Sequence, residues 1–290
     1  MLFIVLALKS LSVLFLILVV GEKAMNELID LEHYPLHEPD SAACKTLIEN
    51  CIADLDRKGM FTLPGFVLSS ALTAMLDRLL PQFVDEAFTH EREHNIYFSD
   101  ELTDIEPEHP ARALQKTINH TLCADQLADN AIRRIYEWPA LARFLARVMK
   151  KDALFMMDDP LARFNVMAYY ENEGLNWHFD RSEFTTTLLL QSPLAGAEFQ
   201  YRPNLRSDGD PNYDGVAKLL RNRDPAVETI ALGAGDLNVF KGKNTAHRIK
   251  PVEGDRPRII GVFTYYEAPG RLFTPEEQQG LYGPVVPGRV

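Results

Sequence analysis

The first part of the chain carries apolar residues at helical spacing. Between residues 41 and 59 they recur at intervals of three and four, which predicts a helix that Gly59 ends. A second stretch of this kind begins near residue 70, and we expect Pro81 to kink or end it. Later stretches with the same spacing cover residues 126–136 and 139–149. We therefore expect a helical support region over residues 25–155.

The pattern changes in the second part of the chain, where short runs of β-branched and aromatic residues alternate with turns that contain glycine. If the segment before Asp180 is counted as a strand, the chain has about eight strands of this kind. They predict a double-sheet jelly roll, or double-stranded β-helix. The strand-like runs cover residues 163–170, 184–191, 197–201, 228–232, 237–241, 247–250 and 258–266. The fold class is therefore expected to be α+β, with the jelly-roll core in residues 156–290. The polar insert at 203–225 is expected to be a loop or short helix over the mouth of the barrel.

Residues 1–24 are almost entirely apolar and leave three interpretations open. Lys9 interrupts the run, no positively charged segment precedes it, and no clear cleavage site follows it. The interpretation we favour takes Met25 as the true initiator, so that residues 1–24 are a gene-model extension and the protein is cytoplasmic. The alternatives are a membrane anchor formed by residues 2–20 and a cleaved signal peptide.

Composition and charge exclude some classes of partner. The chain has 290 residues and a formal net charge of −11. It contains no run of lysine and arginine interleaved with aromatic residues, so a nucleic-acid partner is not expected. The three cysteines, Cys44, Cys51 and Cys123, form no CxxC pair and no even set, which indicates reduced thiols.

The strongest chemical signal is a pair of possible metal ligands, His178 and Asp180. Side chains two residues apart on an extended strand project to the same face, so this pair can share one metal ion. Alone, the pair is a weak signal, because a histidine and an aspartate on one strand are often simply solvated. His247, on a later strand, would complete the two-histidine, one-carboxylate facial triad of non-haem Fe(II) oxygenases. Arg258 follows on the next strand and is a natural partner for the carboxylate of a co-substrate.

These segments resemble the Fe(II)- and 2-oxoglutarate-dependent dioxygenases over about residues 159–270. The resemblance rests on NWHFDRSEF at 176–184, on the strand that follows it, and on HRIKPVEG at 247–254 with Arg258 beyond it. The branch that they resemble also holds free-amino-acid hydroxylases and radical halogenases. In the halogenases of that branch a small residue replaces the carboxylate ligand. This chain keeps Asp180, which indicates hydroxylation or a related oxidation.

The resemblance also implies a cofactor, co-substrates and roles for particular residues. Fe(II) would be held by the three ligands named above, with 2-oxoglutarate and O₂ as co-substrates. Arg258 would bind the distal carboxylate of 2-oxoglutarate, and Tyr169 and Asn165 would help to orient it. Core packing for Tyr169 and a satisfied polar group for Asn165 are the alternative interpretations. Arg256 shares the strand parity of Arg258, but the spacing of the family favours Arg258.

The function expected from these features is hydroxylation of an unactivated C–H bond in a small molecule, either a free amino acid or a metabolite derived from one. A hydroxylase of protein side chains is the nearest alternative. A cupin-like protein that binds a metal but is not an oxygenase is a second, and a binding module with a decayed site is a third. The sequence identifies neither the substrate nor the oligomeric state.

Overall fold

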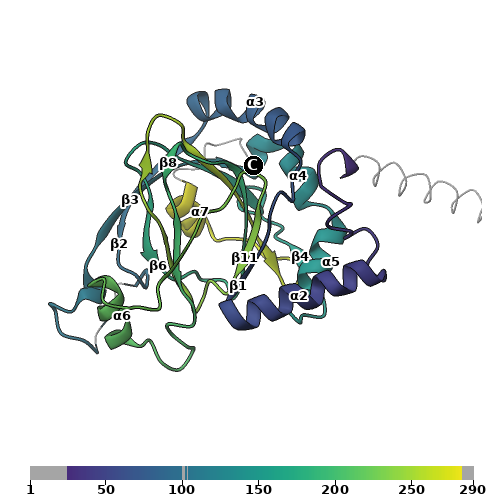
Figure 1. Ribbon diagram of the computed structural model, residues 1–290. Coiled ribbons are helices and arrows are strands. Elements are labelled where there is room, and N and C mark those ends of the chain that lie inside the picture. The colour runs from purple at the N-terminus through teal and green to yellow at the C-terminus, as the bar shows by residue number, and fades with distance from the viewer. Residues whose placement is uncertain (1–24, 100–101, 103, 283–290) are drawn as a thin grey trace, which may run out of the picture.

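The computed structural model describes residues 25–99, 102 and 104–282, and two antiparallel sheets form the centre of the molecule (Figure 1). The larger sheet contains β1 (Met60–Leu63), β2 (Phe88–His94), β3 (Gln115–Cys123), β5 (Phe164–Tyr169), β7 (Thr185–Gln191), β11 (Leu237–Phe240) and β14 (Arg258–Phe263). Its strand order is β1-β11-β7-β14-β5-β3-β2. The smaller sheet contains β6 (Leu175–His178), β9 (Phe199–Arg202), β10 (Glu228–Ile230) and β12 (Ala246–Ile249). Its strand order is β10-β9-β12-β6.

Apolar side chains from the two sheets pack against each other. Leu189, Phe240 and Ile260 come from the larger sheet, and Phe199 and Ile249 come from the smaller one. All five side chains are buried. This double-sheet arrangement confirms the predicted α+β fold with a jelly-roll core. The remaining strands form two short two-stranded sheets. One pairs β4 (Phe155–Met156) with β15 (Tyr265–Tyr266), and the other pairs β8 (Ala195–Gly196) with β13 (Val252–Glu253).

Four helices lie together on one side of the β core, over the outer face of the larger sheet (Figure 1). They are α2 (Ala42–Lys58), α3 (Ser69–Asp85), α4 (Ala131–Tyr136) and α5 (Pro139–Val148). The remaining helices are α6 (Tyr213–Leu220) and α7 (Pro275–Tyr282), with 3₁₀ turns η1 (Pro110–Arg112) and η2 (Ala124–Leu127). Because the helices cover the outer face, the inner face of the larger sheet is left to face the smaller sheet.

Local chemistry explains where α2 begins and ends. The Ser41 side chain accepts a hydrogen bond from the Cys44 backbone N–H at 3.1 Å. Gly59 has a φ of 74°, a left-handed conformation that glycine adopts without strain. In α3, by contrast, Pro81 does not end the helix, which was one of the two expected outcomes, because the helix continues to Asp85. Burial of Leu79 and Phe83 on either side of the proline offsets the one lost backbone hydrogen bond.

The region expected to be a helical support also contributes three strands, β1, β2 and β3, to the larger sheet. Strand β2 has the sequence FTHEREH, in which half-buried and exposed positions alternate. Its polar residues carry no hydrophobic alternation, so the helical pattern around it dominated the prediction. As a result, residues of the first half of the chain line the space between the sheets.

The insert at residues 203–225 contains the short helix α6, as one of the two expectations had it. Val216 and Leu219 of α6 belong to the same buried apolar cluster as Trp177 and Phe179. The apolar run at residues 1–24 lies outside the described residues, so the interpretations of that run stay predictions. Within the part of the chain that the structure describes, no helix combines the length and apolar character needed to cross a membrane.

Candidate metal centre

The three candidate ligands come together at the edge of the smaller sheet. His178 is the last residue of β6 and lies directly opposite His247 of β12 in the antiparallel ladder. Asp180 was expected on the same strand, but it lies two residues beyond the end of β6. A hydrogen bond from its backbone N–H to the Gly242 carbonyl, at 3.1 Å, fixes it there. Even so, the carboxylate lies close to both imidazoles.

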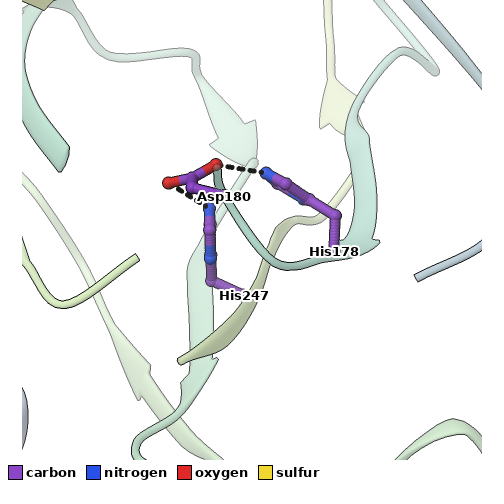
Figure 2. Close-up of side chains that lie close together, drawn as sticks. All are labelled: His178, Asp180 and His247. Carbon is purple, nitrogen blue, oxygen red and sulfur yellow. Dashed lines mark ion pairs between the residues drawn. The ribbon is translucent and has the colours of Figure 1, made fainter. Parts of the chain in front are cut away.

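The side chains converge closely enough to hold one ion (Figure 2). Nε2 of His178 lies 3.3 Å from Asp180 Oδ1, and Nε2 of His247 lies 3.4 Å from Asp180 Oδ2. One ligand atom from each residue can be chosen so that all of them lie within 4.8 Å of one another. These atoms occupy one side of a common centre, as a facial triad requires.

Backbone carbonyls orient both imidazoles. Nδ1 of His178 lies 2.8 Å from the Asn176 carbonyl oxygen, and Nδ1 of His247 lies 3.0 Å from the Thr245 carbonyl oxygen. A carbonyl can only accept, so each Nδ1 carries a proton and each Nε2 faces the centre. Carbonyl acceptors in this position behind the imidazoles are typical of histidines that bind metals.

The site also has the protonation state that a metal ion needs. Burial, together with the neighbouring His247, lowers the pKa of His178 to about 4, so the ring is neutral at neutral pH. Burial by itself would raise the pKa of Asp180, but the two imidazoles beside it hold the pKa well below its usual range. The neutral imidazole of His178 and the ionised carboxylate of Asp180 are suited to bind a divalent cation.

Two further residues form the surroundings of the carboxylate, and the sequence analysis missed both. The Thr185 hydroxyl donates a short hydrogen bond to Asp180 Oδ2. Gly242 lies so close that a Cβ atom at this position would overlap Asp180 Oδ2 and Thr185 Oγ1. A hydroxyl donor and a residue without a side chain therefore fit this part of the centre to a carboxylate.

A pocket with a cavity volume of about 260 Å³ adjoins the three ligands and is lined by both sheets. Arg258 and Tyr169 lie side by side on adjacent strands β14 and β5 and both line this pocket. The Arg258 side chain is 2% exposed, and its Nη1 has no hydrogen-bond partner. Burial lowers the pKa of Arg258 to about 10 and raises the pKa of Tyr169 to about 12.

Because a buried charge without a counter-charge is costly, the guanidinium of Arg258 calls for an anion in the pocket. A dicarboxylate that chelates a metal at the triad and extends to Arg258 would supply one. The residues present therefore fit Fe(II) and 2-oxoglutarate, the groups implied by the sequence.

The other two residues considered for the co-substrate lie elsewhere. Asn165 does not line the pocket, and its Nδ2 donates a hydrogen bond to the Tyr282 hydroxyl at 3.0 Å. Strand parity placed Asn165 on the face of Tyr169, but at the far end of the strand that face meets α7 and not the pocket. Arg256 is exposed and donates to the Pro193 carbonyl at 3.0 Å. The structure thus brings Arg258 and Tyr169 to the pocket, but not Asn165 or Arg256.

Three residues from the first half of the chain line the same pocket and were not expected there. They are Arg92 of β2, Asn119 of β3 and Phe98, which follows β2. The one available signal was the period-two series of His90, Arg92 and His94, which is typical of a strand but carries no hydrophobic residue.

With this geometry in place, comparison with known proteins identifies the family. The Halogenase D family matches residues 66–271, which covers the smaller sheet, every strand of the larger sheet except β1, and all three candidate ligands. The chain belongs to this family, and the protein is an oxygenase of the superfamily that uses Fe(II) and 2-oxoglutarate. None of the curated proteins matches the chain.

Solved structures show the same fold at low sequence identity. The non-haem α-ketoglutarate-dependent epimerase SnoN from nogalamycin biosynthesis is 16% identical, with a TM-score of 0.52 over 77% of this chain and 83% of its own. The α-ketoglutarate-dependent carbocyclase SnoK from the same biosynthesis is 12% identical, with a TM-score of 0.52 over 75% and 83%. HygX from Streptomyces hygroscopicus, solved with nickel and 2-oxoglutarate bound, is 13% identical, with a TM-score of 0.50 over 74% and 85%. At this identity the likeness establishes the fold only.

Proposed function

We propose that the protein hydroxylates an unactivated C–H bond of a small molecule, either a free amino acid or a metabolite derived from one. The substrate, 2-oxoglutarate and O₂ would yield the alcohol, succinate and CO₂, with one oxygen atom entering the substrate and one entering succinate. The observation that carries the proposal is the carboxylate of Asp180, kept between His178 and His247 in a pocket that also contains the unpaired Arg258.

Each residue of the pocket has a defined task in this reaction. His178, Asp180 and His247 would hold Fe(II), and the bound ion supplies the oxidation of the C–H bond coupled to decarboxylation of 2-oxoglutarate. Arg258 would pair with the distal carboxylate of 2-oxoglutarate, since a guanidinium can donate two parallel hydrogen bonds to it. Tyr169, beside Arg258 in the sheet, would donate its hydroxyl to the same carboxylate.

Hydroxylation is favoured over halogenation by the surroundings of the carboxylate. A radical halogenase needs a vacant position for a halide where this chain has Asp180. Thr185 donates to the carboxylate and Gly242 leaves room for it, so the neighbouring residues match a carboxylate and not its loss. The family name describes one reaction that this fold supports, while these contacts support another.

The size of the pocket supports a small substrate. Its volume of about 260 Å³ lies near the lower end of the range for small-molecule sites, which is about 300–1,000 Å³. Part of this space would be taken by 2-oxoglutarate. A hydroxylase of protein side chains would instead need a surface that accommodates a peptide on both sides of the reacting residue.

The test is the release of succinate by the purified protein supplied with Fe(II), 2-oxoglutarate and O₂, with and without each free amino acid. We expect one or more amino acids to stimulate release and to gain the mass of one oxygen atom. A product that contains chlorine when chloride is present would show that the protein is a halogenase and not a hydroxylase. Stimulation by peptides alone would favour the protein hydroxylase, and no release of succinate under any condition would contradict the proposal.

We also propose that the protein acts in the cytosol, where Fe(II) and 2-oxoglutarate are readily supplied. Cell fractionation with peptide mass mapping tests this proposal. Recovery of the protein in the cytosolic fraction is expected. Recovery with membranes, as a form that retains residues 2–20, would show that the apolar run is an anchor.

A further inference from the structure

Arg92 enters the pocket from β2, the edge strand of the larger sheet. Its guanidinium carbon lies 4.5 Å from the centre of the Phe98 ring, and the Phe98 ring lies 5.5 Å from the ring of the candidate ligand His178. Phe98 has a φ of 51°, a left-handed conformation that is strained for a bulky residue. The surrounding structure therefore holds this ring firmly between the arginine and the metal centre.

Arg92 forms no ion pair with any described residue, although Tyr169 and Asp180 attract its charge from a greater distance. Its Nε is buried and makes no hydrogen bond, and the π face of Phe98 is its nearest compensation. Burial lowers the pKa of Arg92. Arg181 provides a contrast in the same pocket, because its side chain is 74% exposed and pairs with Glu277 at 3.5 Å. Arg92 is thus available to form an ion pair with an anionic ligand, whereas Arg181 already forms one with Glu277.

The pocket has more positive charge than 2-oxoglutarate alone would neutralise. Among the described lining residues, Asp180 is the only one with a carboxylate, and it belongs to the metal centre. Two arginines, Arg258 and Arg92, have no carboxylate partner. The distal carboxylate of 2-oxoglutarate would satisfy one of them, and the metal ion would neutralise its other end. One arginine is left without an anion.

We propose that Arg92 binds the carboxylate of the substrate, and that the pocket selects carboxylic acids with a mainly apolar body. This inference rests on the proposed function and names the substrate class of the same site. Apart from its charged groups, the pocket is lined largely by apolar side chains, among them Met167, Phe240 and Val262. A substrate held by its carboxylate at Arg92 would extend past Phe98 toward His178, which brings its carbon chain close to the metal centre.

A rival assignment gives Arg92 to 2-oxoglutarate itself. Arg92 lines the same pocket as Arg258 and Tyr169, so a ligand in this pocket can meet both arginines. The rival predicts a weakened affinity for 2-oxoglutarate when Arg92 is changed, and the test measures that affinity separately.

The experiment compares L-amino acids with their carboxamides on the wild type and on Arg92→Gln. Succinate release is measured with Fe(II) and 2-oxoglutarate, and ligand-detected NMR measures binding of the same pairs. In the wild type, acids should bind and stimulate release, whereas carboxamides should not. In Arg92→Gln, kcat/KM for the best acid should fall at least about tenfold, as expected for loss of a charge-assisted contact. Its KM for 2-oxoglutarate without amino acid should change less than about twofold, since that contact belongs to Arg258.

Two controls separate charge from general damage. Arg92→Lys keeps the charge without the planar fork and should retain part of the preference for acids. Arg143→Gln removes an exposed arginine that does not line this pocket and should behave as the wild type.

The outcomes that overturn the inference are distinct from those that overturn the proposed function. Equal binding of acids and carboxamides, an unchanged preference in Arg92→Gln, or no binding of any acid would each exclude a carboxylate site at Arg92. A KM for 2-oxoglutarate that rises tenfold in Arg92→Gln would assign the arginine to the co-substrate. If the wild type releases no succinate, the proposed function fails, yet the NMR comparison still decides whether Arg92 binds carboxylates.

Discussion

At one end of the pocket, two imidazoles and an ionised carboxylate converge on a common centre, with backbone carbonyls behind the rings. At the other end, the guanidinium of Arg258 is buried beside Tyr169 without a counter-charge. The first end carries a negative charge that suits a cation, whereas the second end carries a positive charge that suits an anion. A metal ion and a dicarboxylate that bridges the two ends would complete both. The pocket therefore places a negative charge at one end and a positive charge at the other.

The largest expected effect comes from removing a ligand at the metal end. His178→Ala, Asp180→Ala and His247→Ala each remove one of three protein bonds to the metal, so turnover of 2-oxoglutarate should fall below detection. Succinate release measures this, and circular dichroism should show a fold like that of the wild type. Turnover at the wild-type rate in any one of the three variants would refute the triad. Asp180→Gly, assayed with chloride, tests in addition whether a vacant position permits halogenation, although we expect inactivation.

The next prediction breaks the support behind the carboxylate and leaves the ligands in place. Gly242→Ala adds a methyl group that overlaps Asp180 and Thr185, so the carboxylate must move. Changes to groups that support a ligand typically cost about 10–100-fold in metal affinity or activity, and we expect a loss in this range. Titration with Mn(II) or Fe(II) measures the affinity. Gly209→Ala, at a position with open space around it, is the matched control and should bind metal normally. Normal metal affinity in Gly242→Ala would show that the carboxylate tolerates the shift.

At the arginine end, Arg258→Ala should raise the KM for 2-oxoglutarate at least about tenfold, because a charge-assisted contact is lost in a buried site. Metal affinity should be unchanged, since the triad lies at the other end. Steady-state kinetics and metal titration measure the two quantities separately. Arg256 lies two residues earlier and its side chain is exposed, so Arg256→Ala should change neither the KM for 2-oxoglutarate nor the metal affinity. If Arg256→Ala has the larger effect on KM, the carboxylate clamp is Arg256.

The smallest expected effect distinguishes Tyr169 from Asn165. Tyr169→Phe removes one hydroxyl beside Arg258 and should raise the KM for 2-oxoglutarate by about 3–10-fold, the equivalent of one hydrogen bond. Asn165→Ala should leave KM unchanged and lower the melting temperature, because it removes the buried contact with Tyr282. Kinetics and thermal unfolding of both variants provide the comparison. An increase in KM for Asn165→Ala alone would give Asn165 the role that the sequence first suggested.

The sequence by itself determined the jelly-roll fold and drew attention to His178, Asp180, His247 and Arg258. These features can be predicted because they depend on local rules. Alternation along a strand fixes which side chains share a face, and turn residues fix where strands end. The choice of Arg258 over Arg256 needed the spacing of the family, because both residues have the same strand parity.

Tertiary structure decided the features that depend on contacts between distant segments. It paired His247 with His178, brought the polar strand β2 and its Arg92 to the pocket, and turned Asn165 toward Tyr282. It also placed Gly242 against Asp180. None of these follows from periodicity, because strand pairing and packing join residues far apart in the chain, and their free energy is gained only when the whole core closes. For this reason the sequence predicts the candidate metal ligands, while the surroundings that we propose select the substrate, and those that contact the carboxylate, emerge only from the folded chain.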